Sequence, residues 1–402
     1  MAYGSGVFAQ VGAVPTSSPP MLDFVFAVDD PLAWHAENLR RNREHYPYLA
    51  AAAGAAVIAR IQDSGFGARL WYNALVPVPA AAVASAPPPA APAPLQQPRL
   101  MKYGVISTRA LVDDLYHWNT LYIAGRMHKP VYTITEQVTA YLGAWQGPAP
   151  AHPAAAAGAA PPQPQRALPP GQSLDHALHC NLRSALASAM LLLPGSFSSL
   201  ELFSAITGLS YTGDWRMVFG EDPHKVRNIA RGSLPAFFDL YSQLLREQPF
   251  ASLVSVEGEG AEFWCDTSPR ARLELGLQLP LQVQRRMGEA FRAQGSSSSS
   301  SGGPLPQQQQ QQHDLAAGSL RGHARYTAMR EPLVSALWGS VARGGSGSSA
   351  VVRHSLTSAL SGIVGPSARG QSILGILTAG PAKSTAYAAQ KIIKSIRGLL
   401  RG

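Results

Sequence analysis

Four low-complexity stretches interrupt this chain of 402 residues and determine which parts of it can fold. Two are Ala/Pro runs at residues 77–98 and 147–171, one is a Ser/Gln tract at 295–312, and one is a short Gly/Ser run at 344–349. Such compositions bury too little apolar surface to offset the loss of chain entropy, so we expect disordered insertions and linkers there. The folded structure must be assembled from the segments between them.

Residues 1–146, apart from the insertion at 77–98, mix strand and helix signals. The run MLDFVFAV at 21–28 is typical of a buried strand, and apolar runs at 69–76 and 100–107 read as two strands paired across the insertion, which would be an expanded hairpin tip. Helices are expected at 31–44, 49–62 and 108–121. This mixture predicts an α/β domain with a mixed sheet.

Residues 172–294 show a different pattern, which is mainly helical. The segment 237–245 and the leucines of the preceding segment recur at helical spacing, the latter being Leu178, Leu182, Leu186 and Leu191. We therefore expect a second, mainly helical domain, followed after the Ser/Gln tract by a C-terminal region at 313–402. That region is basic, because it holds eight Lys or Arg and no acidic residue after Glu331.

The last residues, 383–402, predict a basic amphipathic helix. At 100° per residue, the apolar side chains from Ala389 to Leu400 fall on one arc and the basic ones on the opposite arc, the latter being Lys391, Lys394, Arg397 and Arg401. Such a helix lies in the interface of an anionic membrane, although packing on the protein's own core remains an alternative. No run approaches the roughly 20 apolar residues of a spanning helix, so we do not expect the chain to cross a membrane.

The net charge of +9 favours partners that carry negative charge. Nucleotides, nucleic acids and acidic lipid headgroups all satisfy that condition. Charge alone does not choose between them.

One residue of the strand at 21–28 is anomalous, because Asp23 places a carboxylate in an apolar run. A buried carboxylate is costly unless a metal or several donors bind it. The chain also begins with a Gly4-Ser5-Gly6 turn, whose glycines would let backbone N–H groups approach phosphates. A Gly-Ser-Gly turn before a strand that carries Asp is the arrangement of nucleotidyltransferases, in which the carboxylate holds Mg²⁺ on a nucleoside triphosphate.

The strand departs from the usual nucleotidyltransferase pattern, which has a second acid two residues later. That position is Val25, and Asp29 on the same face would lie roughly 20 Å from the first acid along an extended strand. A second metal ligand must then come from elsewhere. Asp214 is the leading candidate, and Asp113 and Asp114 are weaker ones.

Four basic residues, Lys102, Arg126, Lys129 and Arg216, are candidates for phosphate contacts, because Lys102 lies in an apolar strand and the others in short polar segments. Each reading has a structural alternative. Lys102 could be solvated on an edge strand, Arg126 or Lys129 could cap a preceding helix, and Asp214 could be an ordinary turn residue.

Several segments, in this order along the chain, together resemble the mitochondrial phosphatidate cytidylyltransferases, also called translocator assembly and maintenance proteins. They are AYGSGVF at 2–8, MLDFVFAVDDP at 21–31, KYGVIS at 102–107, LYIAGR at 121–126 and GLSYTGDWRM at 208–217. The resemblance covers nearly all of the chain outside the four low-complexity stretches. Members of this family normally have a leader before the first of these segments, so we expect the natural start to lie upstream.

The resemblance implies a nucleotidyltransferase domain of the polymerase-beta type, a winged-helix-like helical domain and Mg²⁺. It also implies the reaction of CTP with phosphatidate to give CDP-diacylglycerol and pyrophosphate, for cardiolipin and phosphatidylglycerol synthesis, on the matrix side of the mitochondrial inner membrane. Asp23, Lys102 and Asp214 would then be catalytic, and the two acids would hold the metal. The nucleotide would be bound by Gly4, Ser5, Gly6, Arg126, Lys129 and Arg216, and no nucleic-acid partner is expected.

Two other functions remain open at this point. A non-enzymatic assembly factor for inner-membrane protein complexes would bind no CTP. An RNA nucleotidyltransferase would share the fold and would bind RNA with a steep dependence on salt.

Overall fold

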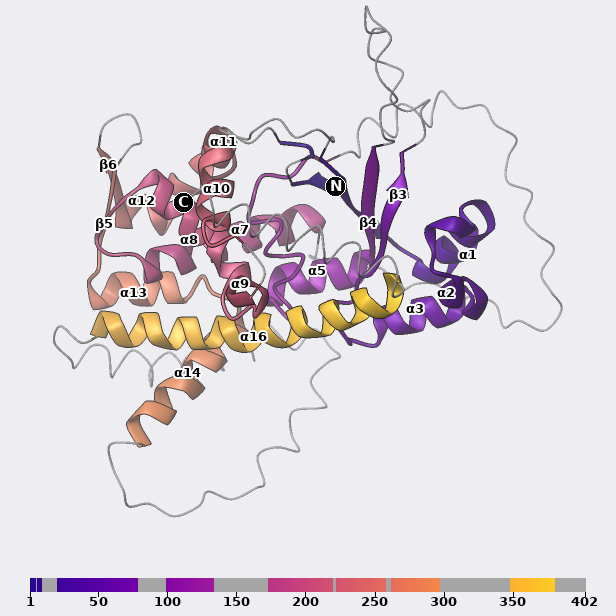
Figure 1. The fold of residues 1–402 in the computed structure, drawn as a ribbon. Coiled ribbons are helices and arrows are strands. Elements are labelled where there is room, and N and C mark those ends of the chain that lie inside the picture. Colours follow the sequence, from indigo (N-terminus) through magenta and orange to yellow (C-terminus); the bar gives the residue numbers. More distant parts are fainter. Residues whose placement is uncertain are drawn as a thin grey trace, which may run out of the picture.

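A computed structural model describes residues 1–4, 6–8, 20–78, 99–133, 173–219, 222–257, 262–296 and 348–379. A sheet with its helices and a second, helical body lie side by side, and one long helix runs along both (Figure 1). The predicted helix at 383–402 and nearly all of the low-complexity residues lie outside the described part of the chain.

The first body is built on a four-stranded sheet with the strand order β1-β2-β4-β3. The strands are β1 (Ala2–Tyr3), β2 (Leu22–Val28), β3 (Trp71–Pro77) and β4 (Leu100–Ser107). β2 and β4 are parallel, whereas β1 pairs with β2 and β3 pairs with β4 in antiparallel fashion. The predicted α/β fold with a mixed sheet is confirmed.

β3 and β4 form the hairpin expected on either side of the first insertion. Their pairing continues to the edge of the described residues, where the Val78 N–H donates to the Arg99 carbonyl over 2.8 Å. Two strands that stay paired to this point can carry a long connection at little cost, because loop-closure entropy grows only slowly with length.

The helices of this body are α1 (Pro31–Arg41), α2 (Tyr48–Ala53), α3 (Ala55–Asp63) and α5 (Thr108–His117), with a 3₁₀ turn η1 (Arg43–His45). The single helix expected at 49–62 is therefore two helices. They meet at Gly54, whose φ of +84° ends one helix and starts the next. The helices expected at 31–44 and 108–121 are each shorter than predicted, since Asn42 and the left-handed Trp118 end them.

The two faces of the sheet have different neighbours, because successive side chains of a strand point to opposite sides. Phe26 and Tyr103 pack with Trp34 of α1, and Trp71 packs with Ile58 of α3. The other face joins the main core of the protein, which includes α5 and the helical body. Asp23 and Lys102, which are register partners, belong to that second face.

The second body is mainly helical, as predicted. Its longer helices are α7 (Leu174–Leu192), α8 (Ser199–Gly208), α10 (Lys225–Gly232), α11 (Leu234–Leu245), α13 (Pro269–Gly276) and α14 (Leu281–Ser296). Two short helices, α9 (Arg216–Phe219) and α12 (Phe250–Leu253), and the 3₁₀ turn η2 (Leu209–Tyr211) complete the helical part. A small antiparallel sheet of order β5-β7-β6 is formed by β5 (Ser196–Ser198), β6 (Val254–Glu257) and β7 (Glu262–Cys265).

The last described element, α16 (Ser348–Ala379), is a helix of 32 residues that the sequence did not predict. Pro366 and several glycines lie inside it, and such residues argue against a helix. The packing explains Gly365 and Gly370, because α16 approaches other backbones closely there. A Cβ added to Gly370 would lie 2.8 Å from the backbone nitrogen of Gly67, and one added to Gly213 would lie 2.2 Å from Oγ of Ser361.

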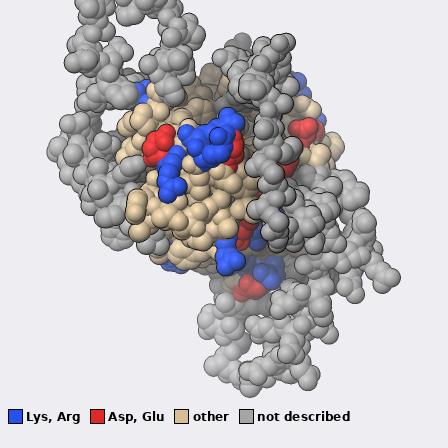
Figure 2. Space-filling model, turned by 90° about the vertical axis from the view of Figure 1, so that its right-hand side faces the viewer, with Lys and Arg blue, Asp and Glu red and all other residues tan. Residues whose placement is uncertain are grey.

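At the opposite side of the sheet, α1, α2 and α3 form one end of the molecule. Figure 2 faces this end and shows a wide surface without charged side chains, with blue side chains gathered along part of its edge. No helix in the described residues is both long enough and apolar enough to cross a membrane.

The segment after α5 is held by a buried carboxylate. Asp114 accepts hydrogen bonds from the backbone N–H groups of Thr120, Leu121, Ile123 and Ala124 at 2.7 to 3.2 Å, and from the Thr120 hydroxyl. Its side chain thus organises a turn that contains no regular helix or strand. Asp114, a weaker candidate for a metal ligand in the sequence, has both oxygens engaged in this turn.

We predict that Asp114→Asn destabilises the protein by about 3 kcal/mol, because the amide NH₂ group would face buried N–H donors where a carboxylate oxygen accepted them. The matched control is Asp113→Asn, at the neighbouring, more exposed carboxylate, which makes a hydrogen bond to Asn119. That change should cost less than about 0.5 kcal/mol. Urea unfolding measures both, and equal costs would contradict this role of Asp114.

Candidate functional site

The turn that follows β1 lies against Asp23. Gly4 has a φ of +80°, and a Cβ added there would lie 3.3 Å from Oδ2 of Asp23. The N–H groups of Val7 and Phe8 both donate to the Gly4 carbonyl over 3.0 Å. At Gly6 a Cβ would lie 2.4 Å from the Met21 carbonyl oxygen, so both glycines are needed for this close approach. Ser5 lies outside the described residues.

Lys102 lies beside Asp23, in register on the parallel strand β4. Its Nζ is 4.1 Å from the centre of the Tyr72 ring, and the Tyr72 hydroxyl is 3.4 Å from that of Tyr3. β4 is an inner strand of the sheet, so the alternative of a solvated edge-strand lysine is wrong. Lys102 faces the interior side on which Asp23 lies.

Arg126 comes from the turn organised by Asp114 and reaches the same region. Its guanidinium carbon is 4.9 Å from the ring centre of Tyr3 and 4.5 Å from that of Tyr122, which are cation–π distances. Its Nε is buried and has no hydrogen-bond partner among the described residues. A buried donor of this kind has capacity for an anionic ligand.

Asp214 and Arg216 face this group from the helical body. The Arg216 Nε donates to both carboxylate oxygens of Asp214 at 3.0 and 3.1 Å, and its Nη2 donates to Oδ2 at 2.5 Å. The Asp214 N–H donates to the Tyr211 carbonyl, so the predicted turn is present as well. The buried carboxylate of Asp214 therefore orients the guanidinium of Arg216.

Three cations converge on one phenol. Burial favours the neutral form of Tyr122, but Arg126, Lys102 and Arg216 favour its anion and lower the pKa of Tyr122 to about 8. Lys102 belongs to the sheet, Arg126 to the turn after α5 and Arg216 to the helical body. Tyr122 therefore marks the place where these three parts of the protein meet. A phenol with lowered pKa is a strong hydrogen-bond donor to an anion.

Lys129 is half-buried next to this group. Its Nζ donates to the Gly125 carbonyl and, over 3.1 Å, to Oγ of Ser210. The alternative from the sequence is that Lys129 caps a preceding helix. Its bond to the Gly125 carbonyl is a similar interaction, but the segment that it caps is a turn. Burial, with the nearby charges of Arg126 and Lys225, lowers the pKa of Lys129 to about 7.

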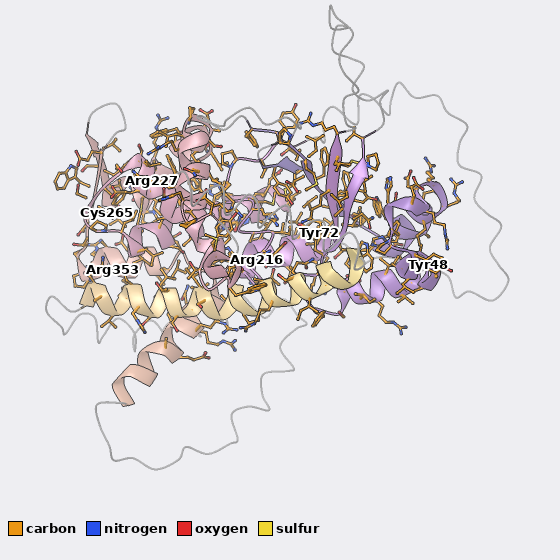
Figure 3. All side chains as sticks on the ribbon, viewed as in Figure 1. Tyr48, Tyr72, Arg216, Arg227, Cys265 and Arg353 are labelled. Carbon is orange, nitrogen blue, oxygen red and sulfur yellow. The ribbon has the colours of Figure 1, made fainter. Side chains whose placement is uncertain are left out.

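A pocket opens between the turn after α5, the turn before α9 and α16. Tyr122, Arg126, Tyr211, Asp214, Arg216 and Ser367 are among the residues that line it. Figure 3 shows Tyr72 and Arg216 in the middle of the molecule, where the sheet and the helical body meet. The structure thus brings the predicted basic residues and Asp214 to one region, with Asp23 on the sheet at its edge.

Asn181 of α7 fixes the turn after α5 to the helical body. Its Oδ1 accepts from Nε1 of Trp118 and from Nε2 of His128 at 2.8 and 2.9 Å, and its Nδ2 donates to the Ala124 carbonyl. Every one of these groups is buried. The turn that carries Arg126 is therefore held by Asp114 of α5 and by Asn181 of α7.

Sequence reasoning missed the aromatic and helical parts of this site. Tyr3 and Tyr122 stand next to predicted residues in the segments AYGSG and LYIAGR, which is a signal that could have been used. Ser367 carried none, because the helix that bears it was not predicted. Its Oγ donates to the Thr120 carbonyl over 2.8 Å and so joins α16 to the turn that carries Tyr122.

Comparison with known proteins identifies the family. Residues 1–145 and 163–394 match the family described as mitochondrial phosphatidate cytidylyltransferase. The chain belongs to this family. The match spans both bodies and the segments that surround the pocket.

Individual family members agree over the same span. A mitochondrial phosphatidate cytidylyltransferase of Xenopus laevis is 34% identical over 401 residues, which is 100% of this chain and 91% of that protein. The protein of that name from Bos taurus is 33% identical over 400 residues, with the same two shares. The one from Danio rerio is 39% identical over 287 residues, or 71% of this chain and 69% of that protein.

The lowered pKa of Lys129 predicts a dependence of stability on pH. The folded state releases its proton near pH 7, whereas the unfolded chain keeps it up to about pH 10.5, so the free energy of unfolding should rise with pH between these values. The rise can reach about 1.4 kcal/mol per pH unit for one proton. Urea unfolding at several pH values should show it.

Lys129→Met should reduce that slope, because the titrating group is gone. A smaller rise remains expected from Tyr122, whose lowered pKa acts in the same direction. Slopes that are identical in the parent and in Lys129→Met would show that Lys129 titrates normally in the folded protein.

Proposed function

We propose that this chain is a phosphatidate cytidylyltransferase, which transfers the cytidylyl group of CTP to phosphatidate and releases pyrophosphate. One observation carries the proposal: Arg126 and Arg216 line one pocket with Tyr122, and Lys102 lies over the neighbouring Tyr72 ring beside Asp23. A buried cluster of cations suits a reaction in which both substrates are phosphates. Membership of a family with this name supports it.

The reaction needs little from the protein besides position and charge. A phosphatidate oxygen attacks the α-phosphorus of CTP, a new P–O bond forms, and the bond to the β-phosphate oxygen breaks as pyrophosphate leaves. The attacking oxygen is already ionised near neutral pH, so no strong general base is required. The transition state is stabilised by cations held in place beforehand.

We assign the two phosphate groups to two sides of the region. The Gly4 turn and Lys102 lie beside Asp23 on the sheet, and they suit the triphosphate. Arg126 and Arg216 line the pocket and suit the phosphate of phosphatidate. The unpaired Nε of Arg126 supplies a donor that such a ligand would satisfy.

The residues present fit a magnesium ion at Asp23. A side chain at Gly4 would approach Oδ2 of Asp23 to 3.3 Å, so the glycine keeps a Cβ away from this carboxylate. Mg²⁺ is commonly bound by one or two carboxylates together with substrate phosphates. When bound, Mg²⁺ would neutralise charge on the triphosphate. Both oxygens of Asp214, the expected second ligand, accept from Arg216, so a metal there would have to displace a guanidinium.

The remaining expectations are part of the same proposal. The name of the relatives supports a mitochondrial location, and we propose the matrix side of the inner membrane and a supply of CDP-diacylglycerol to cardiolipin and phosphatidylglycerol synthesis. The basic segment 383–402 would hold the chain on an anionic membrane surface. No nucleic-acid partner is proposed.

Asp23→Asn tests the site. Purified protein with CTP, Mg²⁺ and phosphatidate vesicles should release pyrophosphate, and the substitution should lower kcat about 100-fold or more because the metal loses a carboxylate ligand. Asp29→Asn, at an exposed acid just after the other end of β2 that accepts a hydrogen bond from the Thr108 hydroxyl, should leave the rate unchanged. Equal rates for parent and Asp23→Asn would refute this role of Asp23.

Calorimetry with CTP and Mg²⁺ separates the proposal from the alternatives. A purely structural assembly factor predicts no heat of CTP binding. An RNA nucleotidyltransferase predicts binding of RNA that weakens steeply with salt. The proposed enzyme predicts CTP binding and activity that depends on phosphatidate.

Ser367→Ala tests whether α16 positions the phosphate-binding turn. Loss of its bond to Thr120 should raise KM for phosphatidate about fivefold, since one hydrogen bond contributes about 1 kcal/mol. Ser372→Ala is the matched control, because that hydroxyl bonds only within α16, to the Ala368 carbonyl. An unchanged KM in Ser367→Ala, or equal shifts in both variants, would contradict a positioning role.

A further inference from the structure

Two large apolar side chains stand almost fully in solvent at one end of the molecule. Tyr48 is 81% exposed and Leu49 is 79% exposed, more than any other large apolar residue in the described chain. They are the first two residues of α2. Figure 3 shows Tyr48 at the end of the molecule away from Arg216 and the pocket.

The exposed surface around them is apolar over α2 and the first part of α3, as far as the exposed Arg60. From Tyr48 to Ala59, every exposed residue is apolar: Tyr48, Leu49, Ala52, Ala53, Ala56 and Val57. A helix face exposed to water normally carries charged or polar residues. We call these six residues the α2–α3 face.

The inner sides of the same helices are already used. Ala51 and Ile58 are buried in a cluster with Tyr46 and Trp71, so the helices cannot turn their outer residues inward. The break at Gly54 separates α2 from α3. The exposed apolar residues therefore do not contribute to the core that holds these helices in place.

Arginines border the face. Arg40, Arg41 and Arg43 are exposed just before α2, and Glu37 binds the first two of them. Together with Glu44, these five residues have a net charge of +1. Figure 2 shows basic side chains, with acidic ones among them, beside an uncharged surface. The border is therefore compatible with an anionic partner, while the face itself offers only apolar contact.

Beyond the end of α3, where Arg60 and Asp63 are exposed, two more large apolar residues stand in solvent near α16. Phe66, after α3, and Ile373, on α16, are both exposed. Gly67 packs directly on Gln371, so the two chain segments touch. α16 ends at Ala379, and the basic segment predicted to bind membranes follows in the chain.

We propose that the α2–α3 face docks on the surface of a phospholipid bilayer, with Tyr48 and Leu49 inserted between the headgroups. The proposal rests on the proposed function, because that function has a substrate that resides in a bilayer. A tyrosine with an apolar ring and a polar hydroxyl suits the interface, and a leucine suits the depth just below it. The face is a second point of attachment, separate from residues 383–402.

The double variant Tyr48→Ser/Leu49→Ser tests this in the full chain. Flotation with vesicles of phosphatidylcholine and phosphatidate, without CTP, should require about tenfold more lipid for half-maximal binding, because two apolar side chains no longer leave water. The difference should persist at high salt, which weakens attachment through basic residues but not apolar insertion. Both side chains are exposed, so thermal unfolding should be unchanged.

Val256→Ser/Trp264→Ser is the matched control. These two apolar residues, each 48% exposed, lie on the paired strands β6 and β7 in the other body, with their side chains on opposite faces of the sheet. The control should float like the parent. Equal flotation of the parent and the Tyr48→Ser/Leu49→Ser variant overturns the proposal, and so does an equal loss in the control.

Two further outcomes are decisive. In the first, the parent is a dimer in solution, the Tyr48→Ser/Leu49→Ser variant is a monomer, and flotation is unchanged. The face then binds a second copy of the chain, and the proposal is wrong. Pyrophosphate release with phosphatidate dispersed in detergent tests the proposed function separately. The double variant should match the parent there, and absence of activity in both would refute the function without changing what flotation shows.

Discussion

The site depends on keeping several positive charges close together away from water. Lys102, Arg126, Lys129 and Arg216 repel one another, and burial increases that repulsion because less water screens it. The protein offsets it with aromatic rings, which contact Lys102 and Arg126 at cation–π distances, and with the carboxylate of Asp214. Burial and this repulsion lower the pKa of Lys129, which is therefore the cation of this group that loses its charge most easily. A phosphate ligand would relieve the remaining repulsion.

Such an arrangement needs supports that do not move, and these are buried polar side chains outside the pocket. Asp114 holds the backbone of the turn that carries Tyr122 and Arg126, and Asn181 joins that turn to α7. Ser367 joins it to α16. Three parts of the chain thus determine one turn that has no regular secondary structure of its own.

The sequence predicted the sheet, the interrupted hairpin and the helical body, because hydrophobic periodicity reports which side of a strand or helix is buried. It also singled out basic residues that the structure brings together, since a cation in an apolar strand or short polar segment is conspicuous, and their role in binding stays a prediction. It failed for Asp114, whose partners are backbone groups that leave no pattern in the sequence. It failed for α16, because the glycines that permit its close packing are the residues that argue against a helix.

Long-range contacts of α16 have a consequence for the order of folding. Gln371 accepts a hydrogen bond from the backbone of Ala68, which is 303 residues earlier, and Ser367 contacts Thr120 across 247 residues. Contacts of such separation form late, and during synthesis the earlier segments emerge first. A nascent chain can build the sheet long before the helix that lines its pocket exists. The pocket is therefore complete only when nearly all of the chain has been made.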